Sequence, residues 1–164
     1  PISVGKMVQG LPTFVPATPH GVMLILEHYK IDTKGKNAVV IGRSNIVGRP
    51  MSILLSANTQ QGNCTVTICH SHTRNLKEIC LQADIIVAAA GVAHLIKPDM
   101  IKPGAAVLDV GITRTDAGLV GDIDPACAEV AGHIAPMPGG TGPMTRAMLI
   151  MNVVESAERA AGLA

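Results

Sequence analysis

The sequence predicts an α/β protein whose doubly wound, mostly parallel sheet is flanked by helices. Short apolar runs rich in β-branched residues alternate along the chain with segments of helical periodicity. Alternating strands and helices form βαβ units, whose right-handed crossovers place the helices on the faces of a parallel sheet. The 164 residues, 48% of them hydrophobic, are enough for one domain with a sizeable core.

The first helix and the first strand set the pattern. Thr18 offers an N-cap followed by a proline, and a helix is expected from there to about Tyr29. The run at 38–41, Ala-Val-Val-Ile, is short and apolar throughout, which is typical of a strand buried on both faces. The same criteria predict strands at 64–69, 84–89, 105–110 and 133–135 and helices at 45–58 and 75–82. In the helix at 45–58, Ile53 and Leu54 are expected to face inward.

The last third of the chain carries a hairpin and a long final helix. The stretch 113–122, with an Asp-Ala-Gly turn at 116–118, is predicted to be a β-hairpin. Asp124 is expected to cap a short helix that ends near Ala131. The final helix begins at Thr141 and is apolar on more than one face, which indicates that it covers a second surface.

These elements divide the chain into three parts. Residues 21–141 are expected to form one self-contained domain of the Rossmann type. Residues 1–20 contain four prolines and no sustained periodicity, and they are expected to be a connector from an upstream domain that is missing here. The start at Pro1 agrees with a cut inside a longer protein. Residues 142–164 are expected to pack as a helix toward that missing domain.

Composition argues against several classes of partner. The chain has 13 basic and 12 acidic residues with no run of like charge, so no nucleic acid and no membrane is expected as a partner. Phe14 and Tyr29 alone would be too few for stacking on single-stranded nucleic acid. The four cysteines form no C-x-x-C pair, and no apolar stretch is long enough to span a bilayer. We therefore expect a reducing, cytoplasmic location.

The first candidate site is the turn at 42–48, Gly-Arg-Ser-Asn-Ile-Val-Gly, because ligands of open α/β sheets bind where the first strand turns into its helix. Gly42 matches the first glycine of the dinucleotide-binding pattern G-x-G-x-x-G. Ser44 and Val47 occupy the second and third glycine positions, and Gly48 comes one place late. Gly42 permits a tight turn, and the helix N-terminus offers N–H groups to phosphate. Taken alone, the turn also fits an ordinary βα connection.

The end of the second strand favours NADP over NAD. NAD sites place a carboxylate there to bind the ribose 2′-hydroxyl, whereas the sequence at 69–74, Cys-His-Ser-His-Thr-Arg, has none. Arg43 and Ser71 could converge on one 2′-phosphate. They are also compatible with a solvated cation and a helix cap. His70 and His72 lack a second ligand pair at matching spacing, so no metal site is predicted.

Two further segments follow later strands. Gly91 comes after the third strand, and Gly111 and Ile112 end the fourth, so these residues are expected at the edge where a nicotinamide would rest. The loop at 136–145 contains three glycines and three prolines and leads to a helix N-terminus. This composition predicts a rigid, shaped loop, with a plain connector as the alternative.

Several motifs together resemble the bifunctional methylenetetrahydrofolate dehydrogenase/cyclohydrolase family of one-carbon folate metabolism, in the family's order. They are Thr18-Pro19-x-Gly21, Val39-Val40-Ile41-Gly42-Arg43-Ser44-x-Ile46-Val47-Gly48-x-Pro50, Cys69-His70-Ser71-x-Thr73-x-Asn75-Leu76, Asp109-Val110-Gly111-Ile112, Gly121-Asp122 and Pro138-Gly139-Gly140-x-Gly142-Pro143-Met144-Thr145. The resemblance covers essentially the whole chain and identifies it with the NADP-binding, C-terminal domain of such enzymes.

The resemblance implies a set of site residues. Cofactor-binding residues are expected to be Gly42, Arg43, Ser44, Ile46, Val47, Ser71, Gly91, Gly111 and Ile112. Residues of the substrate cleft are expected to be Pro138, Gly139, Gly140, Gly142 and Pro143. The catalytic lysine and tyrosine of the family lie in an N-terminal domain, so no catalytic residue is assigned in this chain.

The resemblance also implies an activity. The family oxidises 5,10-methylenetetrahydrofolate with NADP to 5,10-methenyltetrahydrofolate and hydrolyses the product to 10-formyltetrahydrofolate. The isolated chain is expected to be inactive, and a homodimer formed through this domain is expected. The alternatives are a non-catalytic nucleotide-binding module and an NADP dehydrogenase of another small substrate. A methyltransferase is disfavoured because no acidic residue follows the second strand.

Overall fold

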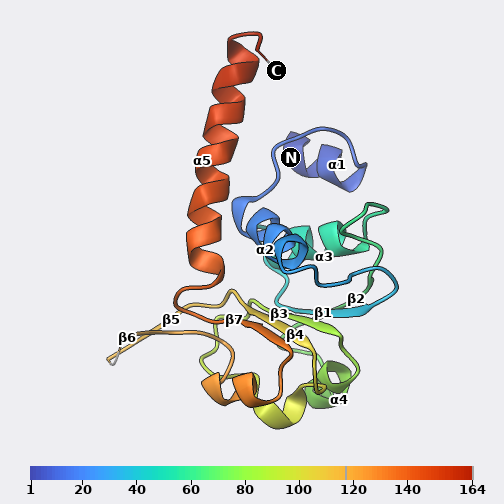
Figure 1. The fold of residues 1–164 in the computed structure, drawn as a ribbon, viewed down its shortest axis with the longest axis vertical. Coiled ribbons are helices and arrows are strands. Elements are labelled where there is room, and N and C mark those ends of the chain that lie inside the picture. The colour runs from blue at the N-terminus through green and yellow to red at the C-terminus, as the bar shows by residue number, and fades with distance from the viewer. Residues whose placement is uncertain (117, 164) are drawn as a thin grey trace.

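The computed structural model describes residues 1–116 and 118–163, and its centre is a five-stranded parallel sheet of order β2-β1-β3-β4-β7 (Figure 1). The strands are β1 (Asn37–Ile41), β2 (Thr65–Cys69), β3 (Ile85–Ala88), β4 (Ala106–Asp109) and β7 (His133–Ala135). From β1 the chain turns first toward β2 and then back to β3 on the other side. This reversal of strand order confirms the doubly wound α/β fold.

The strand register aligns the carboxyl ends of the sheet. Ile41 of β1 is paired with Cys69 of β2 on one side and with Ala88 of β3 on the other. Ala88 is in turn paired with Asp109 at the end of β4. The segments that follow these four residues therefore leave the sheet along a single edge, which is where an open parallel sheet binds its ligand.

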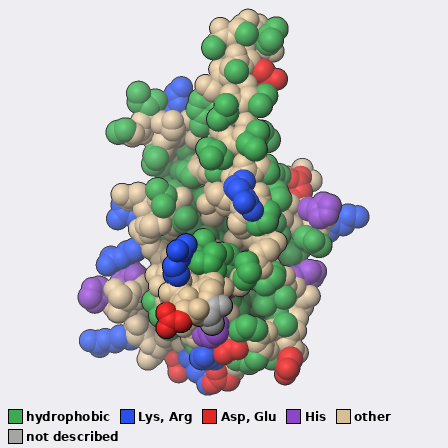
Figure 2. Space-filling model, turned by 90° about the vertical axis from the view of Figure 1, so that its left-hand side faces the viewer, with side chains coloured by type: hydrophobic (Ala, Val, Ile, Leu, Met, Phe, Trp, Pro, Cys, Tyr) green, Lys and Arg blue, Asp and Glu red, His purple; other side chains and the backbone are tan. Residues whose placement is uncertain are grey.

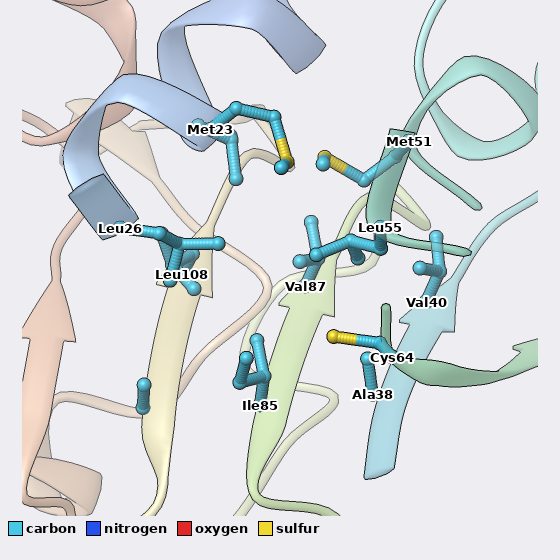
Figure 3. Close-up of a cluster of buried hydrophobic side chains, with 12 residues drawn as sticks. Met23, Leu26, Ala38, Val40, Met51, Leu55, Cys64, Ile85, Val87 and Leu108 are labelled. Atoms are coloured by element: carbon cyan, nitrogen blue, oxygen red, sulfur yellow. The ribbon is translucent and has the colours of Figure 1, made fainter. Parts of the chain in front are cut away.

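Each strand of the sheet centre is buried on both faces. Ala38, Val40 and Leu108 point into one apolar cluster, together with residues of α2 (Ala17–His28) and α3 (Gly48–Ser56) (Figure 3). Val39 and Val107 alternate with them and point into a second cluster. That cluster is covered by α4 (Leu76–Leu81) and the 3-10 helices η1 (Pro98–Met100) and η2 (Pro125–Glu129). The two-sided burial explains why these strands are apolar throughout.

The last helix, α5 (Thr141–Ala160), packs on α2 and then projects away from the sheet (Figure 1). The two helices approach closely at Gly21, where an added Cβ would lie 3.0 Å from the Cβ of Met144. Beyond this crossing, many apolar side chains of α5 are exposed (Figure 2). The short helix α1 (Ile2–Val8) lies at the same end of the molecule and is also apolar on its exposed side. No described helix is both long and apolar enough to cross a membrane.

Most expected elements are confirmed, but α1 was not expected, and two helices begin at other residues than predicted. Helix α1 lies within the segment that was expected to be irregular. Thr18 is not an N-cap, because α2 begins at Ala17, and its hydroxyl instead accepts a hydrogen bond from Thr145 at 3.1 Å. Helix α3 begins at Gly48 rather than at residue 45, because the residues before it form a turn.

The buried face of α3 agrees with the expectation only in part, because Leu54 packs against the apolar cluster but does not form its centre. Met51 and Leu55 are completely buried, whereas Ile53 and Leu54 are only partly buried. Met51 and Leu55 lie four residues apart, on one side of the helix, and this side forms the centre of the buried face.

The last third of the chain follows the sequence prediction closely. Strands β5 (Thr113–Thr115) and β6 (Gly118–Val120) form the expected antiparallel hairpin, and Asp124 caps η2 by accepting the amide of Ala126 at 3.0 Å. The expected short helix is a 3-10 helix rather than an α-helix. Ala117, at the expected hairpin tip, and Ala164, at the end of the final segment, lie outside the described residues.

Replacement of Leu55 tests the position of the core. Leu55→Ala removes a completely buried side chain, so we expect the free energy of unfolding to fall by about 2–5 kcal/mol. The matched control is Leu149→Ala on α5, where the side chain is 57% exposed and the change should stay within about 0.5 kcal/mol. Urea denaturation of both variants measures this difference. Equal losses would contradict the described packing of α3.

Candidate functional site

The turn after β1 passes very close to its neighbouring strands. The amide of Gly42 donates to the carbonyl oxygen of Cys69 at 2.8 Å. Gly42 has a φ of +121°, a conformation that side chains rarely adopt, and an added Cβ would collide with the carbonyl oxygen of Ala89. Only glycine meets both conditions, so the turn is built for a close approach of backbone.

Gly48 supplies the close helix packing of this turn. An added Cβ on Gly48 would collide with the carbonyl oxygen of Gly42, so the first turn of α3 rests directly on the end of β1. In the G-x-G-x-x-G pattern, the third glycine has this role. Gly48 therefore takes the role of the third glycine, although it lies one residue later than the pattern requires. The reason is that α3 begins at Gly48.

Ser44 stabilises the turn with its side chain. Its Oγ accepts the amides of Val47 at 3.1 Å and Gly48 at 3.3 Å. Two N–H groups that the sequence analysis left free for a phosphate are thus already engaged. The amides of Asn45 and Ile46, ahead of them, donate to no acceptor among the residues described, and both residues are exposed. The turn consequently presents its unpaired donors in front of α3.

Arg43 and Ser71 leave the sheet from adjacent strands. Each lies two residues beyond the paired ends Ile41 and Cys69, and both are exposed. Arg43 forms no ion pair with any described carboxylate. This placement suits a guanidinium and a hydroxyl that bind one anion.

One alternative for this edge, a helix cap at Ser71, is excluded. Ser71 is not a helix cap, because α4 begins at Leu76 after Asn75. The rings of His70 and His72 lie 6.0 Å apart, and within the described ranges no group of three or more metal-ligating side chains comes together.

A buried carboxylate holds the loop after β3 from the interior of the protein. Asp122 is completely buried and accepts the amides of Ala90 at 2.6 Å, Gly91 at 3.0 Å and Val92 at 2.9 Å. Gly91 has a φ of +71° and is exposed, with open space beside its α-carbon. The loop therefore presents its other side at the sheet edge, where Gly91 was expected.

The end of β4 carries a second buried carboxylate. Asp109 accepts the amides of Asp122 at 2.9 Å and Ile123 at 3.0 Å. Burial raises the pKa of the Asp109 carboxyl to about 6. Gly111 lies against this network, because an added Cβ would collide with the carboxylate of Asp122. Ile112 follows with 55% of its surface exposed, at the position expected for the nicotinamide end.

The proline-rich loop reaches the same edge through Thr141. The Thr141 hydroxyl donates to the carbonyl oxygen of Asp109 at 2.6 Å, so the start of α5 is tied to the end of β4. Within the loop, an added Cβ on Gly140 would lie 2.5 Å from the carbonyl oxygen of Pro136, which shows how tightly it is folded. Pro138, Gly139, Gly142 and Pro143 complete the segment. The compact shape agrees with the rigid loop predicted from its composition.

An apolar groove of about 850 Å³ runs beside this loop and the edge strand β7. It is lined by the end of α2, by β4 and β7, and by residues of the proline-rich loop that include Pro136, Gly139 and Gly140. Tyr29 lies on its rim and is 63% exposed.

The structure thus brings the expected cofactor residues to one edge, in the segments after β1, β2, β3 and β4. Sequence reasoning missed the roles of Asp109 and Asp122, which it noted only as members of motifs. One signal was available for Asp109: a carboxylate at the end of a buried strand needs hydrogen-bond donors inside the protein.

Comparisons with known proteins agree with this geometry. A family model described as tetrahydrofolate dehydrogenase/cyclohydrolase, NAD(P)-binding domain, matches residues 16–161. The bifunctional protein FolD of Paracidovorax citrulli is 56% identical over 162 residues, which are 98% of this chain and 56% of that protein. The chain thus spans about half the length of the curated relatives that it matches.

Two solved structures are similar throughout the described chain. The bifunctional enzyme FolD, methylenetetrahydrofolate dehydrogenase/cyclohydrolase, from Campylobacter jejuni has a TM-score of 0.92 and 48% identity over 98% of this chain and 56% of that one. The Trypanosoma brucei enzyme, complexed with NADP cofactor and inhibitor, has a TM-score of 0.89 and 36% identity, covering 98% of this chain and 57% of that one.

Substitution of Gly48 tests the close packing of the turn. Gly48→Ala forces the start of α3 away from β1, so we expect the free energy of unfolding to fall by about 1–3 kcal/mol. The control is Gly142→Ala in the first turn of α5, where no atom lies within 4 Å of the added Cβ. There, alanine should leave the stability unchanged or raise it by up to about 1 kcal/mol. Urea denaturation compares the two, and a harmless Gly48→Ala would refute the described contact.

Proposed function

We propose a function that proceeds from one premise: this chain belongs to the tetrahydrofolate dehydrogenase/cyclohydrolase family, through its NAD(P)-binding domain. In our proposal, it provides the NADP-binding half of an enzyme that oxidises 5,10-methylenetetrahydrofolate to 5,10-methenyltetrahydrofolate. The same enzyme hydrolyses that product to 10-formyltetrahydrofolate. The proposal agrees with the names of the longer relatives, of which this chain spans about half.

The observation that carries the proposal is the pairing of Arg43 with Ser71 at the ends of adjacent strands. Both are exposed, and no carboxylate is present between residues 69 and 74. Such an edge suits the 2′-phosphate of NADP, because a planar guanidinium can bind two phosphate oxygens and a hydroxyl can donate to a third. A ribose 2′-hydroxyl, in contrast, would find no acidic partner there.

The remaining residues of the proposed site hold the cofactor in place. Gly42 lets the backbone approach the pyrophosphate closely, and the unpaired amides in front of α3, including that of Ile46, are available to donate to it. Gly91, Gly111 and Ile112 border the opposite end of the same edge. Bound NADP supplies the hydride acceptor for the oxidation. In this proposal the domain fixes the plane of the nicotinamide ring and its distance from the substrate.

The other half of the relatives is proposed to supply the acid–base chemistry, and it is proposed to dock on the projecting end of the molecule. The support is the large number of apolar side chains that are exposed there (Figure 2). They are Ile2, Val4, Val8 and Leu11 near α1 and Leu149, Ile150, Met151, Val153 and Val154 on α5. In this proposal residues 1–20 connect the two halves, residues 21–141 bind NADP, and residues 142–164 contact the other half.

The proline-rich loop is proposed to border the folate cleft. It is compact, it is tied to the end of β4 by Thr141, and it leads into the helix that reaches the projecting end. A loop in this place separates the proposed nicotinamide edge from the proposed docking face. The proposed cleft residues are those that the family resemblance implies, Pro138, Gly139, Gly140, Gly142 and Pro143.

A cytoplasmic, reducing location is part of the proposal. All four cysteines, Cys64, Cys69, Cys80 and Cys127, are free and buried. Thiols of this kind act as small apolar side chains and need no oxidising environment.

A nucleotide titration tests the proposed function. We expect the chain to bind NADP more tightly than NAD, and Arg43→Ala to lower the NADP affinity by about 10–100-fold, because charge-assisted hydrogen bonds to the 2′-phosphate are lost. The affinity for NAD, which lacks that phosphate, should change by no more than about twofold to threefold. Isothermal titration calorimetry measures both.

Arg49 provides the matched control for this titration. It is an exposed arginine in the first turn of α3 whose side chain donates to Asn45 at 3.2 Å. Arg49→Ala should leave the preference for NADP intact. A preference for NAD, or equal losses of both nucleotides in Arg43→Ala, would count against the proposal.

We also propose a homodimer formed through this domain. The support is the outer edge of β7, which pairs only with β4 in the sheet, and the apolar groove beside it. An open strand edge and an apolar groove are together suited to a second copy of the chain.

Sedimentation velocity should give twice the chain mass of 16.9 kDa. Tyr29→Asp, on the rim of the groove, should weaken the association, because it puts a charge into an apolar interface. Leu81→Asp, on the opposite face of the sheet, should not. A monomer at every concentration would refute the homodimer.

A further inference from the structure

Asp122 is unusual because it is a completely buried carboxylate without a cationic partner. It forms no ion pair with any described Lys, Arg or His. Instead, its two oxygens accept three successive amides, those of Ala90, Gly91 and Val92. Burying a charge is costly unless hydrogen bonds compensate, and an apolar side chain would fill the same space at lower cost. The carboxylate therefore serves the shape of the loop more than the stability of the core.

The loop that Asp122 holds is exposed on its outer side. Ala90, Gly91 and Val92 are all exposed, although their N–H groups point inward to the carboxylate. Between Ala90 and Val92, the positive φ of Gly91 and the open space at its α-carbon leave the middle of this outer side without a side chain. Such a surface suits the close approach of a flat or ring-shaped group.

Asp109 holds Asp122 in turn. It accepts the amides of Asp122 and Ile123, and it lies at the end of β4, where its position is fixed by the sheet. The segment that carries Asp122 is also tied to its neighbour, because the Ile96 amide donates to the Asp122 carbonyl oxygen at 2.9 Å. The loop is thus connected to the rigid sheet through two successive carboxylates.

The glycines around this network are required by the carboxylates. A Cβ on Gly111 would collide with the Asp122 carboxylate, and a Cβ on Gly121 would collide with the Asp109 carboxylate. Neither glycine has a positive φ, so backbone conformation is not the reason for them. Both leave room for the carboxylates, which indicates that the whole arrangement acts as one unit.

We propose that Asp122, backed by Asp109, is a positioning residue that holds the loop 90–92 in the shape that receives the nicotinamide half of the cofactor. This inference rests on the proposed NADP-binding function. The carboxylate touches no cofactor itself and acts only through the three amides. The adenine half, which lies at β2 in the proposal, is independent of this network.

The two halves of the cofactor can be tested separately. NADP contains both halves, whereas adenosine 2′,5′-bisphosphate contains only the half that Arg43 and Ser71 are proposed to bind. Asp122→Asn keeps the size of the side chain but replaces one accepting oxygen with an NH₂ group that faces N–H donors. We expect it to lower the NADP affinity by about tenfold or more, and the affinity for the bisphosphate by less than about twofold.

Asp124→Asn is the matched control. Asp124 also accepts a backbone amide, that of Ala126, but it caps η2 and pairs with Lys97, and among the described residues it forms no hydrogen bond with the loop 90–92. This variant should bind both ligands as the unchanged chain does. If Asp122→Asn lowers both affinities equally, or lowers neither, the proposed positioning role is refuted. If the unchanged chain binds NADP no more tightly than the bisphosphate, the loop does not receive the nicotinamide half, and the proposal is refuted as well.

Failure of the proposed function itself would look different, because the unchanged chain would then bind neither ligand. If Asp122→Asn does not fold, NMR measurements on the unsubstituted chain can still test the proposal. The backbone amide resonances of residues 90–92 should be protected from hydrogen exchange and should shift on addition of NADP but not of the bisphosphate. Resonances that shift equally with both ligands, or with neither, would refute the proposal.

Discussion

Strands β1, β3 and β4 are buried on both faces, and this two-sided burial fixes the geometry on which the candidate site depends. A shift of register by one residue would exchange the two apolar clusters, so the pairing of Ile41 with Ala88 and of Ala88 with Asp109 is strongly specified. The carboxyl ends are aligned as a result. Four loops from distant parts of the sequence therefore meet at one edge, and the chemistry of the site is a property of that edge.

The sequence predicts the sheet well because its signals are local. Short apolar runs bounded by polar turns identify all five strands, and the turn at 42–48 identifies the edge that binds a ligand. The absence of a carboxylate after β2 can also be recognised in the sequence, because it concerns a few consecutive residues. The site residues after β1, β2, β3 and β4 could thus be placed from sequence, and the family motifs added the proline-rich loop. Their individual contacts with a cofactor stay predictions.

The features that could not be predicted depend on contacts between distant segments. The start of α3 at Gly48 brings the helix so close to Gly42 that a side chain on Gly48 would not fit, and no propensity describes this contact. Asp122 holds a loop that lies 30 to 32 residues earlier, and the link between them exists only once the sheet has formed. Thr18 has the sequence signature of a cap, yet its hydroxyl binds Thr145, 127 residues away. Tertiary packing overrides the local preference in each case.

The packing of α5 on α2 has a consequence for the order in which the chain can fold during synthesis. Domains form from the N-terminus as the ribosome releases the chain, but the side of α2 that meets α5 stays uncovered until α5 emerges, after every strand of the sheet. Until then, the surface of α2 around Gly21 is uncovered in the nascent chain. The sheet and its carboxyl edge can assemble before α5 has been synthesised. The candidate site therefore forms before α5 packs on α2. A bound nucleotide could thus stabilise the unfinished protein while its last helix is still being made.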